Sequence, residues 1–310
     1  MSLVINHNLM SMNAARNLSD SYGKLGISTR RLSSGLRVGT AADDAAGLAI
    51  RELMRSDIQS LQQGIRNAND GISLIQTADG ALQVVDEKLI RMKELAMQAS
   101  TGTYNSDQRQ VIDSEYQAMA SEITRISNAT DFNGIYLLNG NLGGNSESAH
   151  DGTGLVSTGP LKVHFGTGND STEDYYYITI AGSTADVLGV GQEAALKGTS
   201  TDSWEERNAG KTISTQALAQ AALGALDQAI ISKDKIRASL GSTQNRLENT
   251  ITNLTIQSEN VQASESRISD VDVATEMTEF VRQQILTQSA VAMLSQANSL
   301  PKMAMQLIGG

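Results

Sequence analysis

The chain has 310 residues and a formal net charge of −10, and it contains no cysteine. The acidic balance disfavours nucleic acid as a partner, and the missing thiols exclude disulfides and cysteine-based metal sites. No apolar run approaches the ~18 residues of a membrane span, so we expect no membrane partner. The first residues are polar and amphipathic, so any export is expected to use a route that reads no cleaved signal peptide.

Aromatic residues make up only 4% of the chain, and there are only two prolines. Compact cores usually rely on aromatic side chains, which bury the most area each. Long helical bundles can instead be packed from Ala, Leu, Ile and Met, and they need few prolines because proline interrupts helices. The composition therefore favours a mainly α-helical fold.

Near the N-terminus, apolar and small residues recur at alternating spacings of four and three, the a/d pattern of a coiled coil. The positions are Ser11, Ala15, Leu18, Tyr22, Leu25, Thr29, Leu32 and Leu36. Gly35 permits a bend after this helix, and Thr40 is a candidate N-cap for the next one. We expect Leu18, Tyr22, Leu25, Leu32 and Leu36 to contribute to an interface between subunits.

Helical periodicity continues from about Ala41 to Ser100, and a turn at 101–106 leads into a second helix that ends near Asn128. Two Asn-Gly pairs then flank a short apolar run in Asp131–Gly140, which is typical of a turn, a strand and a turn. Helical periodicity resumes near Thr212, a candidate N-cap, and runs to about Glu265.

The segment 141–210 between these helices has a different composition. It carries ten acidic residues against three basic ones, and it is rich in Gly, Ser and Thr. Apolar residues alternate with polar ones at Leu161–Phe165 and again at Tyr176–Ile180, which predicts two strands joined by a hairpin loop. We interpret this segment as a β-rich, solvent-facing insert.

The last segment, Asp272–Gly310, repeats the four-and-three pattern of the N-terminus. Its positions are Leu286, Ala290, Met293, Ala297, Leu300, Ala304 and Leu307. We expect Leu286, Met293, Leu300 and Leu307 to lie at the subunit interface, and Pro301 to kink or restart the helix. Each terminal row is expected to pack on the other row or on a neighbouring subunit.

These elements predict a long antiparallel helical bundle, built from both termini, with a small β-rich central insert. Three domains are expected. Residues 1–41 with 270–310 form a terminal coiled-coil domain, residues 42–140 with 211–269 form a helical rod, and residues 141–210 form a variable surface insert.

Motifs for catalysis, cofactors and metals are weak. His7, His150 and His164 do not have the spacing of a zinc-binding helix. Gly210–Thr212 copies the end of a phosphate-binding loop, but Glu205 stands where its first glycine is required. Asp270, Asp272 and Glu276 lack the turn glycine of a calcium loop and are better explained as acids at a helix N-terminus. The sequence therefore predicts no enzyme activity, no cofactor and no metal site.

Several blocks of sequence resemble bacterial flagellins. "RRLSSGLRV" (Arg30–Val38), "DDAAGLAI" (Asp43–Ile50) and "DGISLIQTADGAL" (Asp70–Leu82) resemble the N-terminal region of that family. "SRISDVDVATEMTEFVRQQIL" (Ser266–Leu286) and "LSQANSLPKM" (Leu294–Met303) resemble its C-terminal region. The resemblance covers roughly residues 1–140 and 212–310.

This resemblance implies a secreted, extracellular subunit that polymerises with many copies of itself into the flagellar filament for swimming motility. It also implies an export chaperone on the C-terminal helix, the flagellar export apparatus, and filament cap and hook-junction proteins as partners. Toll-like receptor 5 is a further candidate partner, with Arg91, Leu95 and Glu115 at the positions of its contacts. Two alternatives stay open at this point: a hook–filament junction protein, and a secreted enzyme carried on a flagellin-like scaffold.

Overall fold

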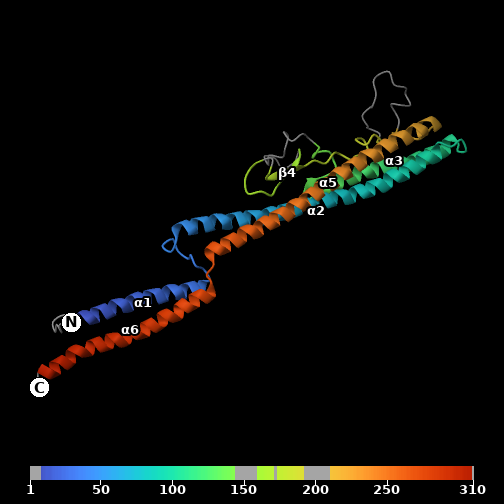
Figure 1. The fold of residues 1–310 in the computed structure, drawn as a ribbon. Helices are drawn as coiled ribbons and strands as arrows, with labels where there is room; N and C mark the ends of the chain where they lie inside the picture. The colour runs from blue at the N-terminus through green and yellow to red at the C-terminus, as the bar shows by residue number, and fades with distance from the viewer. Residues whose placement is uncertain (1–7, 144–158, 171–172, 192–209, 309–310) are drawn as a thin grey trace. The chain divides into compact units, whose positions relative to one another are not determined.

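The computed structural model describes residues 8–143, 159–170, 173–191 and 210–308, apart from the side chains of residues 300–302, 304, 305, 307 and 308. The chain divides into two compact units, Met1–Ile58 with Ser258–Gly310, and Gln59–Gln257. The helices are α1 (Leu9–Ser34), α2 (Ala45–Ala99), α3 (Ser106–Ala129), α5 (Gln216–Ser269) and α6 (Val273–Ile308). The strands are β1 (Asp131–Phe132), β2 (Ile135–Tyr136), β3 (Leu161–His164) and β4 (Tyr175–Ile178). The predicted mainly helical fold with a small stranded region is confirmed (Figure 1).

Local capping explains where the helices begin and end. α3 begins with a capping box, in which the Asn105 side chain accepts from the Gln108 amide and the Gln108 side chain accepts from the Asn105 amide. α1 ends at Gly35, whose φ of 74° is the left-handed conformation that glycine adopts without strain. α6 continues through Pro301 without a restart, so of the two predicted outcomes only a kink at this residue stays a prediction.

Neither Thr40 nor Thr212, the two residues predicted to be helix N-caps, caps a helix in the structure. Asp44, not Thr40, accepts a backbone N–H at the start of α2, from Gly47 at 2.9 Å. At the start of α5, Thr215 accepts from the Leu218 amide, while Thr212 donates to Asp113. Several polar side chains near a helix start can accept hydrogen bonds from its first free amides. The sequence alone therefore does not determine which of these side chains is the N-cap.

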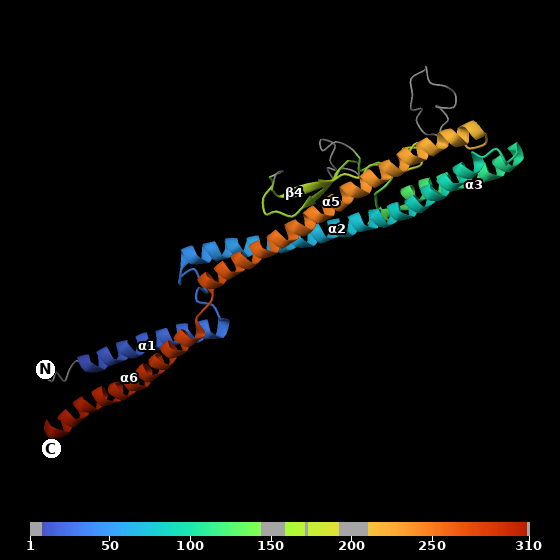
Figure 2. The ribbon, with the colours of Figure 1, turned by 45° about the vertical axis from the view of Figure 1, so that its right-hand side comes forward.

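The core of the unit Gln59–Gln257 forms where α2, α3 and α5 lie side by side (Figures 1 and 2). Alternating threes and fours bury one face of each helix, as expected for antiparallel helices joined by short turns. Its fully buried members include Val85, Leu89, Met92, Tyr116 and Leu226. A second apolar cluster joins α2 and α5 to the β-strands, with Ile75, Leu137, Ile178 and Leu247 among its members.

α3 also fixes the chain where it returns to α5. The Tyr116 hydroxyl donates to the Gly210 carbonyl at 2.7 Å, and the Asp113 carboxylate accepts the Ile213 amide at 2.7 Å. Burial, with a smaller contribution from Asp113, raises the pKa of Tyr116 well above its ordinary value. The hydroxyl therefore stays protonated and available as a hydrogen-bond donor.

The strands form two small hairpins. β1 and β2 are joined by Asn133 and Gly134, with φ of 53° and 81°, so the first Asn-Gly pair makes a tight two-residue turn inside the predicted run. β3 and β4 pair antiparallel, with Val163 opposite Tyr176, which confirms the two predicted strands. The remainder of the predicted insert, 144–158, 171–172 and 192–209, lies outside the described residues.

Gly64 allows the end of β3 to approach α2 closely. A Cβ at this position would lie 2.0 Å from the Phe165 carbonyl oxygen, a backbone atom that cannot rotate away. Leu61, Phe165 and Leu254 form the apolar cluster beside this contact. The small side-chain volume at Gly64 is therefore what lets the hairpin pack on the helix.

We expect Gly64→Ala to destabilise the rod, because the hairpin must move away from α2 and uncover Phe165. Gly80→Ala is the matched control, since a Cβ there meets nothing within 4 Å. In that exposed helical position alanine should stabilise by about 0.5–1 kcal/mol. Urea unfolding of both variants measures the two effects, and equal stabilisation by both substitutions would contradict the proposed close approach.

Candidate functional site

The terminal helices pack on each other through a polar face. α1 and α6 run antiparallel, with the Asn8 side chain donating to the Ala297 carbonyl at 2.8 Å and Arg31 3.6 Å from Glu276 at the other end. The residues of α1 that face α6 include Ser11, Ala14, Leu18, Ser21, Leu25, Ser28 and Leu32, and those of α6 that face α1 include Phe280, Gln283, Thr287, Ala290, Leu294 and Ala297. Small and polar side chains therefore fill most of this contact.

Large apolar side chains lie on the outside of the same two helices. Those that are exposed on α1 are Leu9, Met10, Met12, Tyr22 and Ile27. Those on α6 are Val273, Met277, Val281, Ile285, Leu286, Val291, Met293 and Met303. We refer to these thirteen side chains as the outer apolar surface. Such a density of exposed apolar groups is typical of a surface that binds another protein.

Each predicted terminal row is divided between the inner contact and the outer apolar surface. Leu18 and Leu25 face the partner helix, as does Leu32 at the end of α1, whereas Tyr22 is 55% exposed. Leu286 and Met293 are exposed, while Ala290 and Ala297 in the same predicted row face α1. Within the single chain, neither row packs as one continuous stripe on the other helix, and the interface role of these residues stays a prediction. The side chains of Leu300 and Leu307 lie outside the described residues.

The phase of the α1 stripe differs from the prediction by one residue at alternate positions. Ala14, Ser21 and Ser28 occupy the places expected for Ala15, Tyr22 and Thr29. Ala14, Ser21 and Ser28 are themselves spaced by seven, so a second heptad column of small residues was visible in the sequence.

A groove of about 790 Å³ runs between the two helices. Met10, Leu286 and Met293 give it an apolar lining, and Asp20, Lys24 and Arg282 lie among its polar lining residues. It exposes both kinds of group on one concave surface, which is the composition of many binding clefts.

The linkers at the ends of α1 and α6 pair with each other. Leu36 and Asp270 form an isolated antiparallel bridge, in which the Arg37 amide donates to Ser269 at 2.7 Å and the Val271 amide donates to Gly35 at 3.0 Å. Leu36, predicted to lie at an interface, therefore lies in this bridge and is partly buried. The bridge gives backbone groups of both linkers hydrogen-bond partners.

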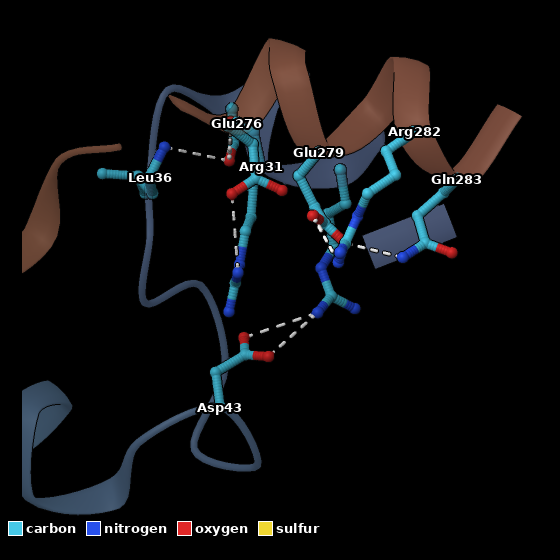
Figure 3. Close-up of polar contacts among 9 residues, drawn as sticks. Arg31, Leu36, Asp43, Glu276, Glu279, Arg282 and Gln283 are labelled. Carbon is cyan, nitrogen blue, oxygen red and sulfur yellow. Dashed lines mark hydrogen bonds and ion pairs between the residues drawn. The ribbon is translucent and has the colours of Figure 1, made fainter. Parts of the chain in front are cut away.

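Charged side chains hold these linkers in place (Figure 3). Arg30 contacts Asp43 at 3.1 Å, and the buried Arg51 donates to the Val38 carbonyl at 2.7 Å. On α6, Glu279 accepts from Arg282 and Gln283. A hydrogen bond from the Thr40 hydroxyl lowers the pKa of Asp43, with Arg30 adding a smaller electrostatic effect.

Asp272 stands at the N-terminus of α6, where its side chain accepts from the Ala274 and Thr275 amides. The Thr275 hydroxyl lowers its pKa first, and those amides lower it further. This is the helix N-terminal role predicted for it. Among the described residues, no group of His, Asp or Glu side chains is placed to hold a metal ion, and His164 lies on β3 beside the Tyr175 ring.

The three candidate receptor-contact residues lie on α2 and α3. Arg91 donates to the Glu115 carboxylate at 2.8 Å and also contacts Glu94 at 2.9 Å. The Arg91 and Glu115 side chains are 48% and 44% exposed, whereas Leu95 is 1% exposed within the apolar core. A direct contact is therefore open to Arg91 and Glu115, and Leu95 can act only by supporting the helix.

The comparisons with known proteins match both ends of the chain. Residues 5–142 match the bacterial flagellin N-terminal helical region, and residues 223–308 match the bacterial flagellin C-terminal helical region. A flagellin of Halalkalibacterium halodurans is 39% identical over 306 residues, which cover 99% of this chain and 100% of that protein.

The chain belongs to the bacterial flagellin family. A flagellar filament 33 kDa core protein of Treponema phagedenis is 37% identical, again covering 99% of this chain and 100% of the relative. As a flagellin, the chain is a structural component of the flagellar filament and not an enzyme. This rules out the alternative of an enzyme on a flagellin-like scaffold.

A solved structure from Vibrio parahaemolyticus, described as a flagellar hook-associated protein, has a TM-score of 0.54. It is 16% identical and covers 74% of this chain and 100% of its own. At that identity the likeness shows only that the helical fold is shared. In the described part of the chain, none of the helices has the length and apolarity to cross a membrane.

Acid should loosen the linker contacts. The folded-state pKa of Asp43 and that of Asp272 lie below their ordinary values, so the ionised carboxylates stabilise the folded linkers at neutral pH. That contribution is present above the unfolded pKa and is lost as the pH falls below about 4, through the folded pKa. We expect the double variant Asp43→Asn, Asp272→Asn to melt earlier at pH 7 and to lose less stability on acidification.

Thermal unfolding followed by circular dichroism from pH 7 to pH 3 measures this difference. Asp57→Asn, Glu259→Gln is the control, because it removes the same number of charges from exposed positions of α2 and α5 in the same unit. If the double variant loses as much thermal stability between pH 7 and pH 3 as the unmodified chain, groups other than Asp43 and Asp272 cause the acid sensitivity.

Proposed function

We propose that the outer apolar surface of α1 and α6 is the polymerisation surface of this flagellin. In this proposal, residues 1–41 with 270–310 form the filament core. Residues 42–140 with 211–269 form the rod around it, and residues 141–210 face the solvent. The observation that supports it is the packing of the terminal helices, with mostly small and polar side chains inside and thirteen large apolar side chains exposed outside.

Energetics favour neighbouring subunits as the occupants of this surface. Burying one Leu, Ile or Met side chain contributes about 1.5–3 kcal/mol, and thirteen large side chains of the terminal pair are exposed. The pair itself is joined largely by small and polar residues, which contribute little burial. Contacts with further copies would therefore supply most of the apolar stabilisation of these helices.

The same surface explains the other partners that we propose. An exported subunit with exposed apolar helices would aggregate before assembly, so a chaperone covering α6 would keep it soluble until it reaches the export apparatus. After export to the extracellular space, the filament cap and the hook-junction proteins would meet the same helices at the two ends of the polymer.

Placing a charge on the outer apolar surface should block assembly without unfolding the monomer. Leu286 and Met293 are 46% and 61% exposed in the single chain, so Leu286→Asp, Met293→Asp leaves monomer packing nearly unchanged. In a polymer the same carboxylates would be buried without partners, at a cost of several kcal/mol each. We expect normal circular dichroism and no filaments by electron microscopy after seeding.

Asn249→Asp, Asn253→Asp is the matched control, because it adds the same charge at exposed polar positions of α5. Filaments of normal length from the double variant would show that the outer apolar surface is not part of the interface between subunits. Failure of the unmodified chain to form long filaments after seeding would instead favour a hook–filament junction role.

We further propose Toll-like receptor 5 as a partner of the Arg91–Glu115 surface. The two side chains form an exposed ion pair between α2 and α3, and Glu115 with Glu94 raises the pKa of Arg91. A preformed charged pair of this kind offers a fixed donor and acceptor to a second protein.

Removing one member should weaken receptor binding by about tenfold, equivalent to about 1.4 kcal/mol. Surface plasmon resonance of the monomer on the receptor ectodomain measures the effect of Glu115→Gln. Glu122→Gln is the control, since Glu122 pairs with Arg125 on the same helix. Equal binding by both variants would exclude Glu115 as a contact.

A further inference from the structure

One buried position on α5 carries a charge where its heptad neighbours are leucines. Positions seven residues apart on α5 hold Leu226, Lys233, Leu240, Leu247 and Leu254, and all of them are buried. Lys233 is 2% exposed, and its ammonium group lies 2.6 Å from Asp86 on α2 and 2.7 Å from Asp234. A lysine at such a core position makes the fold less stable than a leucine would, so we look for a role of Lys233 other than stabilisation.

Two more ion pairs join the same helices on either side of Lys233. Arg237 donates to Asp79 at 2.7 Å, and Lys93 pairs with Asp227. On α2 the three partners are Asp79, Asp86 and Lys93, which are spaced by seven residues. We refer to these three interhelical pairs as the charge ladder.

The apolar packing of α2 and α5 does not by itself fix how far one helix is shifted along the other. The buried column of α2 also repeats every seven residues, through Leu61, Ala68, Ile75, Leu82, Leu89 and Ala96. A slide of one heptad, about 10 Å along the axis, would again place apolar groups opposite apolar groups. The hydrogen bonds from α3 to Gly210 and Ile213 restrain the start of α5, and direct polar contacts between α2 and α5 would disfavour the shifted arrangements along the rest of the helices.

We propose that the charge ladder fixes the axial register of α2 against α5. A slide in one direction brings Lys233 level with Lys93, and a slide in the other brings Asp227 level with Asp86. Either arrangement places like charges together, and in the first arrangement one member, Lys233, is buried. Only the observed register satisfies all three pairs. This role goes beyond polymerisation, because it operates within the single chain.

Reversing the outermost pair tests the ladder, because each reversal favours a different slide. Lys93→Asp turns the native pair into a repulsion with Asp227 and offers Lys233 a carboxylate one heptad away. Asp227→Lys likewise repels Lys93 and offers Asp86 an ammonium group in the opposite direction. Both side chains are substantially exposed, 40% and 54%, so neither substitution disrupts the core.

Because the chain has no cysteine, cysteines at the exposed Gln62 and Ala238 can carry a pair of nitroxide spin labels. Double electron–electron resonance on the monomer then reports the separation of α2 and α5 sites along the axis. We expect one distance in the otherwise unmodified chain. Lys93→Asp should add a population about 10 Å longer, and Asp227→Lys should add one about 10 Å shorter.

Glu122→Lys is the control, since it breaks an exposed pair within α3 and should keep the single distance. If both ladder variants retain only the original distance, the ladder does not set the register. A shift of the same sign in both variants would also overturn the proposal, because it would indicate general loosening. The measurement uses no filament, so its outcome is separate from that of the polymerisation test.

Discussion

The seven-residue repeat of buried side chains along α2 and α5 is the constraint on which the rest of the structure depends. It sets one face of each long helix towards the other, and α3 and the two hairpins complete the core around that contact. The repeat stabilises the contact between the two helices, but it does little to fix their axial register, since each heptad resembles the next. The special residues of the rod are those that break the repetition: Gly64, which admits the end of β3, and Lys233, which replaces a leucine.

The terminal pair uses the same helical geometry with the opposite distribution of side chains. In the rod, leucines and isoleucines face inward, whereas in α1 and α6 the inward positions include Ser28, Gln283 and Thr287. Both arrangements satisfy the backbone hydrogen bonds of the helices. They differ in which side chains stay exposed. The rod buries its large apolar side chains within one chain, whereas α1 and α6 leave theirs exposed for the proposed contacts with neighbouring subunits.

Much of the fold could be predicted from the sequence because long helices carry a strong periodic signal. The positions of α2, α3, α5 and α6, the turn before α3 and the pairing of β3 with β4 all followed from that signal and from turn residues. The candidate interface was harder. An a/d pattern identifies a stripe most clearly when the rest of the helix is polar, whereas α6 has apolar residues on several faces. Tyr22 and Leu286 therefore fall in the same predicted rows as residues that pack between the helices, although both are exposed in the single chain.

The missed residues share one property, which is that their roles depend on partners distant in sequence. In the sequence, Lys233 resembles a surface lysine, because its partner Asp86 lies far away on α2. Arg51 likewise resembles the other charged residues of its helix, because its acceptor, the Val38 carbonyl, lies in the linker. Local capping failed for a related reason, because Asp44 and Thr215 competed successfully with Thr40 and Thr212 for the same amides. Polar specificity in this chain thus arises from tertiary geometry, whereas its helices arise from local pattern. A polymer subunit benefits from this division. Repetitive apolar stripes supply cohesion, and a few charged or small residues determine which of the nearly equivalent alignments is adopted.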